Sequence, residues 1–264
     1  MSKDNIILIL PDWHQNYLFC DAILNKEGAR ADKIIFLGDE FDSFKSPPEV
    51  YSFKKTCKVL KYLIKEHIYK DKFIFILGNH TLSYIYNNNK SGYQSTAIIP
   101  RYYCSGVTKS KISDFRKEFF NHGLCDDFFI KHFKLAYKLD GWLFSHAGVA
   151  NGHIPYGHSI DRFVEEVCPA AWSNFRNLSF NYNYLLSDVG ENRGGDARIG
   201  GMVWQDWKTE FFASQDIGRQ VMGHTTVSKP EVKGEGTDYE SWNIDCGQSW
   251  YGIIENGKFI PVKL

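Results

Sequence analysis

The chain has 264 residues, enough for one large α/β domain or two small ones and for a substantial buried core. Lys+Arg and Asp+Glu each total 31, so the formal net charge is zero. This balance excludes a broad basic surface for nucleic acid, although it leaves room for a local basic patch.

Cysteine usage and the N-terminus bear on the compartment. The six cysteines form no CxxC pair, a pattern typical of reduced thiols rather than of a structural zinc site or a disulfide framework. The apolar part of the N-terminus is too short for a signal peptide, and no apolar run approaches the length of a membrane span. We therefore expect a cytoplasmic protein with no membrane partner.

Three continuous apolar runs near the N-terminus predict strands that are covered on both faces, as in a parallel sheet. These runs are Asn5–Leu10, Lys33–Leu37 and Lys72–Leu77. Tyr17–Ala29 and Glu49–Tyr69, which lie between them, have apolar residues at helical spacing. The resulting β-α-β-α-β order predicts right-handed crossovers.

The remaining segments predict a mixture of loops, helices and antiparallel strands. We expect two loops, at Asn87–Tyr103 and at the glycine-rich Ser187–Gly201. The first would be either a flap over the site or a plain surface excursion. Helices are expected at Ile112–Asn121 and Ser159–Val167. Phe128–Leu139 and Trp142–Ser145 are expected to form a hairpin that turns at Asp140-Gly141. A short strand is expected at Gly218–Met222. A closing antiparallel set is expected from Ser241–Ile244, Tyr251–Glu255 and Lys258–Val262.

Polar motifs follow five of the predicted strands. They are Asp12-Trp13-His14, Gly38-Asp39-Glu40-Phe41-Asp42, Gly78-Asn79-His80, Ser145-His146-Ala147-Gly148 and Gly223-His224-Thr225. The loops after the carboxyl ends of strands in an α/β sheet meet along one edge, where ligands bind. Oxygen and imidazole ligands of this kind suit divalent transition metals, and two such ions together attack phosphate esters.

The order of these motifs resembles the calcineurin-like metallophosphoesterases. Within them it is similar to the phosphoprotein phosphatase branch, which includes small bacterial and phage Ser/Thr phosphatases and symmetrical diadenosine tetraphosphate hydrolases. The tail segments 243–247 and 250–252 are similar to the ending of that branch. The resemblance covers nearly the whole chain and implies a single domain, residues 1–264, with a four-layer αββα sandwich containing two mixed β-sheets.

The resemblance also implies roles for eight residues. It assigns metal ligation to Asp12 and His14 at one ion, Asp39 bridging both ions, and Asn79, His146 and His224 at the second. A hydroxide bridging the two ions would be the nucleophile. His80 would donate a proton to the leaving oxygen, and Asp42 would orient His80 and raise its basicity. Manganese is the first candidate metal, with iron, zinc, nickel and cobalt as alternatives.

Departures from the family pattern bear on the substrate. The family usually has Asp-Arg where Asp42 is followed here by Ser43 and Phe44, so a phosphate-clamping arginine must come from elsewhere or be absent. Arg193 and Arg198 in the glycine-rich loop are candidates, because a guanidinium can bind phosphate oxygens in a bidentate manner. The last motif lacks the second histidine of many phosphodiesterases, which favours the phosphatase branch.

Three functional hypotheses follow. The first is hydrolysis of phosphomonoesters, on a phosphoprotein, a nucleotide or a small phosphoester. The second is hydrolysis of a phosphodiester or a dinucleoside polyphosphate, for which a base could stack on Tyr93, Tyr102 or Tyr103. The third is a metal-binding scaffold without catalysis, against which the complete ligand set and His80 argue.

Overall fold

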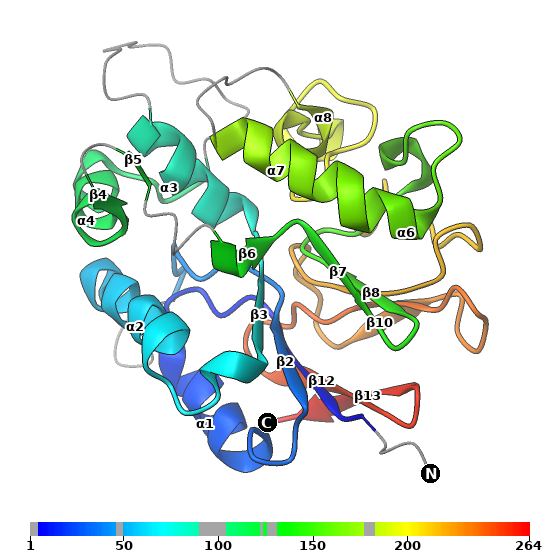
Figure 1. Cartoon of the computed structure of the whole chain (residues 1–264), viewed down its shortest axis with the longest axis horizontal. Helices are drawn as coiled ribbons and strands as arrows, with labels where there is room; N and C mark the ends of the chain where they lie inside the picture. Colours follow the sequence, from blue (N-terminus) through cyan, green and yellow to red (C-terminus); the bar gives the residue numbers. More distant parts are fainter. Residues whose placement is uncertain (1–4, 46–49, 90–103, 122–123, 126–130, 177–182) are drawn as a thin grey trace.

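The computed structural model describes residues 5–45, 50–89, 104–121, 124–125, 131–176 and 183–264 (Figure 1). Two β-sheets form its centre. The first has six strands in the order β13 (Lys258–Lys263), β12 (Trp250–Glu255), β1 (Ile7–Leu10), β2 (Lys33–Phe36), β3 (Phe73–Ile76) and β6 (Phe133–Lys134). Strands β1, β2 and β3 are parallel, whereas β12 runs antiparallel to β1, so this sheet is mixed.

The second sheet has five strands in the order β10 (Glu231–Lys233), β11 (Ser241–Asn243), β9 (Arg219–Met222), β8 (Trp142–Ser145) and β7 (Ala136–Leu139). It is also mixed, because β8, β9 and β11 are mutually parallel while β7 and β10 are antiparallel to their neighbours. A separate pair of short strands consists of β4 (Phe120–Asn121) and β5 (Leu124–Cys125).

Helices lie on the outer faces of the sheets. On the side of β1–β3 are α1 (Tyr17–Glu27), α2 (Phe53–Lys65), η1 (Lys70–Lys72), α3 (Asn79–Asn89) and α4 (Lys109–Phe119) (Figure 1). Further along the chain are η3 (Asn151–His153), α6 (Ile160–Arg162), the π-helix η4 (Phe163–Val167), α7 (Cys168–Arg176), α8 (Tyr184–Ser187) and η5 (Glu191–Arg193). The side chains of Asn16, Ser52 and Thr108 cap α1, α2 and α4, respectively.

The alternation of side chains along each strand divides the core into layers. Ile7 and Ile9 of β1 pack with Phe144 and Val221 of the second sheet, so a buried apolar layer joins the two sheets. Leu8 of β1 belongs to the cluster formed with the helices. Together with the helices seen on both outer sides in Figure 1, this confirms the expected αββα arrangement with two mixed sheets.

Several predicted elements differ from the structure in their partners. The expected strand at Phe128–Leu139 is interrupted: β6 pairs parallel with β3 of the first sheet, and only β7 forms the hairpin with β8. Residues 128–130 lie outside the described part. The expected closing antiparallel set was also wrong in one member, because β11 runs parallel to β9, whereas β12 and β13 pair antiparallel in the other sheet.

Two further differences concern helices. The helix α3 begins at Asn79, directly after β3, and continues to Asn89, so the start of the predicted loop at Asn87–Tyr103 is helical. Residues 90–103, with Tyr93, Tyr102 and Tyr103, lie outside the described residues. The predicted helix at Ser159–Val167 continues as a π-helix and then as α7 to Arg176.

Candidate metal centre

The five motifs converge at the carboxyl ends of the parallel strands of both sheets. Asp12 and His14 follow β1, Asp39 follows β2 and Asn79 follows β3 in the first sheet, while His146 and His224 follow β8 and β9 in the second. The site therefore lies where the two sheets come together. Of these side chains, Asp12 and His146 have no solvent exposure.

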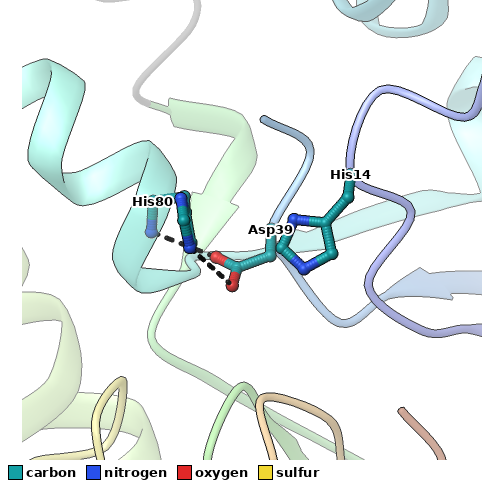
Figure 2. A group of neighbouring side chains, drawn as sticks. All are labelled: His14, Asp39 and His80. Atoms are coloured by element: carbon teal, nitrogen blue, oxygen red, sulfur yellow. Dashed lines mark hydrogen bonds and ion pairs between the residues drawn. The ribbon is translucent and has the colours of Figure 1, made fainter. Parts of the chain in front are cut away.

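Asp39 is the residue that joins the site. Ligand atoms of His14, Asp39 and His80 all lie within 4.8 Å of one another, and so do those of Asp39, His146 and His224. Figure 2 shows the Asp39 carboxylate between the rings of His14 and His80. Its Oδ2 atom is 3.3 Å from Nε2 of His146 and 4.0 Å from Nε2 of His80. One carboxylate thus belongs to two groups with the composition of metal sites.

The backbone around these residues adopts an uncommon conformation. His14, Asp39, Asp42 and His224 have positive φ angles of 38°, 50°, 62° and 67°. Non-glycine residues rarely adopt this region, and they do so mostly where the surrounding structure holds them there. These positive φ angles turn the chain after β1, β2 and β9, where Asp12, His14, Asp39 and His224 meet at the sheet edge.

Glycines allow the close approach of these turns. A Cβ atom on Gly78 would overlap Oδ1 of Asp39, and one on Gly223 would overlap Oδ1 of Asp12. The sequence pattern of Gly before each of these polar motifs therefore has a steric reason, because any larger residue would displace a carboxylate of the site.

Backbone carbonyls orient two of the histidines. Nδ1 of His14 lies 2.8 Å from the carbonyl oxygen of Phe41, and Nδ1 of His146 lies 2.8 Å from that of Leu37. Each Nδ1–H donates to its carbonyl, which fixes the ring and directs Nε2 into the site. A second hydrogen bond of this kind usually orients metal-binding histidines.

Asn79 is held with its amide oxygen toward the site. Its Oδ1 lies 2.9 Å from Nε2 of His146, and its Nδ2–H₂ donates to Sγ of Cys104 at 3.1 Å. Ser83 also contacts this sulfur. The thiol therefore fixes the amide so that its only acceptor oxygen is on the site side.

Burial and the neighbouring charges shift the pKa values of the carboxylates and histidines in the site. Burial raises the pKa of Asp39, but His146 and His80 outweigh it and hold this pKa well below its usual range. Burial lowers the pKa of His146, but Asp39 and Asp12 outweigh it and raise the pKa to about 9. Burial raises the pKa of Asp12 and lowers that of His224.

Two buried atoms test whether the residues suit a metal. Oδ1 of Asp12 and Nε2 of His224 are buried and have no hydrogen-bond partner within the described structure. The other carboxylate oxygen of Asp12 accepts a hydrogen bond from the backbone N–H of His224 at 3.0 Å. Leaving a carboxylate oxygen and an imidazole nitrogen unpaired inside a protein is costly, whereas both are good ligands for a cation. The donor set therefore fits two divalent ions.

His80 is held by a separate polar network. Its Nδ1–H donates to Oδ2 of Asp42 at 2.8 Å, and its backbone N–H donates to Asp39. Oδ1 of Asp42 accepts hydrogen bonds from Tyr84 at 2.6 Å and from Lys111 at 2.7 Å. Burial raises the pKa of Asp42, but these hydrogen bonds outweigh burial and lower it. Asp42 is thus ionised and turns Nε2 of His80 toward the Asp39 side.

The two candidate arginines occupy different surroundings. Arg193 donates to Oγ1 of Thr225, next to His224, at 2.6 Å and forms an ion pair with Asp206 at 3.1 Å. Its Nε atom is buried without a partner in the described structure. Arg198 is exposed, and it is Arg193 rather than Arg198 that contacts Thr225 and Asp206. The geometry thus distinguishes Arg193 from Arg198.

Sequence reasoning missed three residues that support the site. Tyr84 and Lys111 bind Asp42, and Cys104 binds Asn79, although none of them belongs to a motif. Tyr84 is the one with a signal, since it lies one helical turn after His80 and a site-facing helix places such residues on the same side. Lys111 and Cys104 become neighbours of the site only through tertiary folding.

A family profile places the chain among known proteins. The profile of the calcineurin-like phosphoesterases matches residues 6–225. The chain therefore belongs to the calcineurin-like phosphoesterase family and is a hydrolase of phosphate esters. This family is dinuclear-metal dependent, and the described residues contain a cluster able to bind metal. No curated protein matches the sequence.

Solved structures agree on the fold. A cold-active protein-tyrosine phosphatase of a psychrophilic Shewanella species is 16% identical with a TM-score of 0.61, over 99% of this chain and 78% of that chain. A point mutant of a cold-active protein tyrosine phosphatase is 14% identical with a TM-score of 0.59, at 99% and 78% coverage. These likenesses support the architecture alone. In the described residues, no helix is long and apolar enough to cross a membrane.

Proposed function

We propose that this hydrolase cleaves phosphate monoesters at a centre of two divalent ions, and that one domain, residues 1–264, carries the activity. The observation that carries the proposal is the shared position of Asp39 in two groups of potential ligands. One ion would be held by Asp12, His14 and Asp39, and the other by Asp39, Asn79, His146 and His224. When bound, such a pair supplies an activated water and positive charge for the phosphate oxygens.

His80 is assigned to proton transfer although its ring lies within the first group of potential ligands. The reason is its hydrogen bond to Asp42, which leaves Nε2 as the atom that faces the site. A histidine whose Nδ1–H is held by a carboxylate can act as a general acid and donate a proton from Nε2 to a leaving oxygen. Asp42 keeps the ring oriented, and Lys111 and Tyr84 keep Asp42 in place.

Arg193 is the arginine that we assign to binding a phosphate oxygen. It lies beside Thr225 at the second group of ligands. Burial lowers the pKa of His224 most, and the positive charges of His146 and then Arg193 lower it further, so Arg193 acts on the same site. A guanidinium fork matches the geometry of phosphate oxygens. Arg198 would then remain a surface residue.

Manganese is our first choice for both ions, because carboxylate, amide and imidazole ligands suit it; iron, zinc, nickel and cobalt fit the same ligands. Among the described cysteines, Cys20, Cys57, Cys104, Cys168 and Cys246 are free thiols, which supports a reducing, cytoplasmic compartment. The substrate would be a phosphorylated protein, nucleotide or small molecule.

The test compares p-nitrophenyl phosphate with bis-p-nitrophenyl phosphate in the presence of Mn²⁺. Monoester hydrolysis that needs metal and is lost in both Asp39→Asn and His80→Ala would support the proposal. Faster hydrolysis of the diester would replace it with a phosphodiesterase or dinucleoside polyphosphate hydrolase. A protein that binds two ions but hydrolyses neither compound, nor phosphopeptides or nucleotides, would contradict catalysis and indicate a metal-binding scaffold.

A further inference from the structure

Phe44 presents an apolar ring beside the candidate metal centre. Its ring centroid lies 5.5 Å from that of His14 and 6.1 Å from that of His80, in both cases edge to face. Nevertheless, the side chain is 70% exposed. A single exposed apolar residue is common on protein surfaces, so it is the position of this ring that carries the argument.

The turn that carries Phe44 is fixed from two sides. The backbone N–H of Ser43 donates to Oε1 of Gln15 at 3.1 Å, and Nε2 of Gln15 donates to the carbonyl of Tyr51 at 2.6 Å. On the other side, Nζ of Lys45 donates to the carbonyl of Gly247 at 2.8 Å. The ring is therefore held at a defined place next to the site rather than on a free loop.

The neighbouring residues indicate which part of a substrate would reach this ring. Phe44 lies two positions after Asp42, and the carboxylate of Asp42 orients His80. The ester oxygen that receives the proton of His80 must lie within hydrogen-bond reach of Nε2. Because the ring centroids of Phe44 and His80 are only 6.1 Å apart, the group bonded to that oxygen would be within reach of the exposed part of Phe44.

Resting on the proposed monoesterase function, we propose that Phe44 is a specificity-determining residue that selects monoesters with an aromatic leaving group, such as a phosphorylated tyrosine side chain. Aromatic rings pack favourably edge to face or offset when their centroids are about 4.5–7 Å apart. A ring bonded directly to the ester oxygen reaches Phe44, whereas phosphoserine offers only one methylene group there. The base of a nucleotide is separated from the ester oxygen by its ribose.

The reaction is a hydrolysis in which every atom is accounted for. The oxygen of water forms a new bond to phosphorus while one proton of the water is released to solvent, and the bond between phosphorus and the phenolic oxygen breaks. The electron pair of the broken bond stays on the phenolic oxygen, which takes the proton of His80. The products are a phenol and inorganic phosphate, and His80 regains a proton from solvent.

The first experiment measures kcat/KM for two peptides of the same sequence, one with phosphotyrosine and one with phosphoserine, using Mn²⁺-loaded protein. For Phe44→Ala, the ratio of wild-type to variant should be about tenfold larger for phosphotyrosine than for phosphoserine. Comparing these ratios removes the higher intrinsic reactivity of aryl esters. Phe44→Trp should retain the preference for phosphotyrosine over phosphoserine. In Phe44→Leu this preference, the ratio of the two kcat/KM values, should fall by about threefold to tenfold.

The matched control is Ile68→Ala, which removes another apolar side chain, 80% exposed, from the segment that precedes β3 and thus from the opposite edge of the sheet. It should leave both peptides unaffected. Equal losses on both peptides in Phe44→Ala would overturn the assignment while leaving the monoesterase function intact. A larger loss on a nucleoside 5′-monophosphate than on phosphotyrosine would overturn it in favour of a base.

A binding measurement separates this inference from the proposed function. Phenylphosphonate and methylphosphonate carry the same charged group but cannot be hydrolysed at an ester oxygen, and titration calorimetry gives their affinities for the Mn²⁺-loaded protein. Tighter binding of phenylphosphonate, lost in Phe44→Ala, would support the aromatic contact even if no peptide were hydrolysed. Equal affinities for wild-type protein would overturn it.

Discussion

Oδ2 of Asp39 lies 3.3 Å from Nε2 of His146, and the two side chains are only 4% and 0% exposed. Burial lowers the pKa of His146, but the carboxylates of Asp39 and Asp12 outweigh burial and raise it to about 9. A histidine that binds a metal ion must give up that proton, so metal binding at His146 would release it. Asp39 is thus the one residue shared by the two groups of potential metal ligands in the described part of the chain.

Replacing Asp39 by asparagine should remove most of the metal from the protein. The shared carboxylate would be lost from both groups of ligands, and we expect turnover of a phosphomonoester to fall by more than about 100-fold. Metal content after gel filtration, measured by inductively coupled plasma mass spectrometry, and hydrolysis of p-nitrophenyl phosphate would report the two effects.

Asp140→Asn is the matched control for this substitution. Asp140 has the same φ of 50° as Asp39, but it is exposed in the turn between β7 and β8. It should keep its metal and its activity. Retention of two ions per protein in Asp39→Asn, at wild-type affinity, would contradict a bridging role for Asp39.

Arg193→Met and Arg198→Met compare two arginines of one glycine-rich loop. If Arg193 binds a phosphate oxygen, its removal should raise KM and weaken inhibition by inorganic phosphate by about tenfold to 100-fold. Asp206, its ion-pair partner, keeps its hydrogen bonds from Lys208 and Thr209, so the loop should stay folded. Arg198→Met should behave as wild type, and an unchanged KM in Arg193→Met would refute the assignment.

Much of this site could be predicted because its residues follow strong local patterns. The apolar runs of β1, β2 and β3 appear directly in the sequence, and polar motifs after parallel strands meet at one edge for topological reasons. Asp12, Asp39 and His224 could therefore be placed together without knowing any distance. The assignment of these residues to individual ions remains a prediction.

The parts that could not be predicted depend on long-range pairing. Strand β6 joins the first sheet and strand β7 joins the second, although only one residue separates the two strands. No periodicity in the sequence specifies that change of sheet. Lys111 binds Asp42 across 69 positions of sequence. Such partners are chosen by packing of α4 against its neighbours rather than by local propensity.

Thr81→Val should destabilise the protein through Glu40. The hydroxyl of Thr81 donates to the carboxyl of Glu40, and neither residue has any solvent exposure. Burial raises the pKa of Glu40 to about 7, and the hydrogen bond from Thr81 partly opposes this rise. Without the hydroxyl, Glu40 loses a buried partner, so the free energy of unfolding should fall by about 1–3 kcal/mol.

Urea denaturation with and without Mn²⁺ would measure this loss. Thr81→Ser keeps the hydroxyl and serves as the matched variant, which should recover most of the stability. Equal stability of the valine and serine variants would show that the methyl group, not the hydrogen bond, is what position 81 contributes.

His153 should make the folded protein sensitive to acid. Its Nδ1 accepts a hydrogen bond from the N–H of Ala150 at 3.1 Å, and its Nε2–H donates to the carbonyl of Gly200 at 2.8 Å, so the buried ring is neutral. Burial lowers its pKa to about 4, whereas the unfolded chain has a value near 6.5. Between these values the unfolded state binds more protons than the folded state.

The stability contributed by this difference is complete above pH 6.5 and is lost as the pH falls toward 4, by up to about 3 kcal/mol. In His153→Gln no proton can bind at this position, so the free energy of unfolding should decline less steeply than that of wild type over this range. His158→Gln, a half-exposed histidine of the same segment, should follow the wild-type curve. Urea denaturation at intervals between pH 4 and 7 would give these slopes. Because the other buried groups titrate identically in all three proteins, parallel curves for wild type and His153→Gln would mean that His153 is protonated in the folded state.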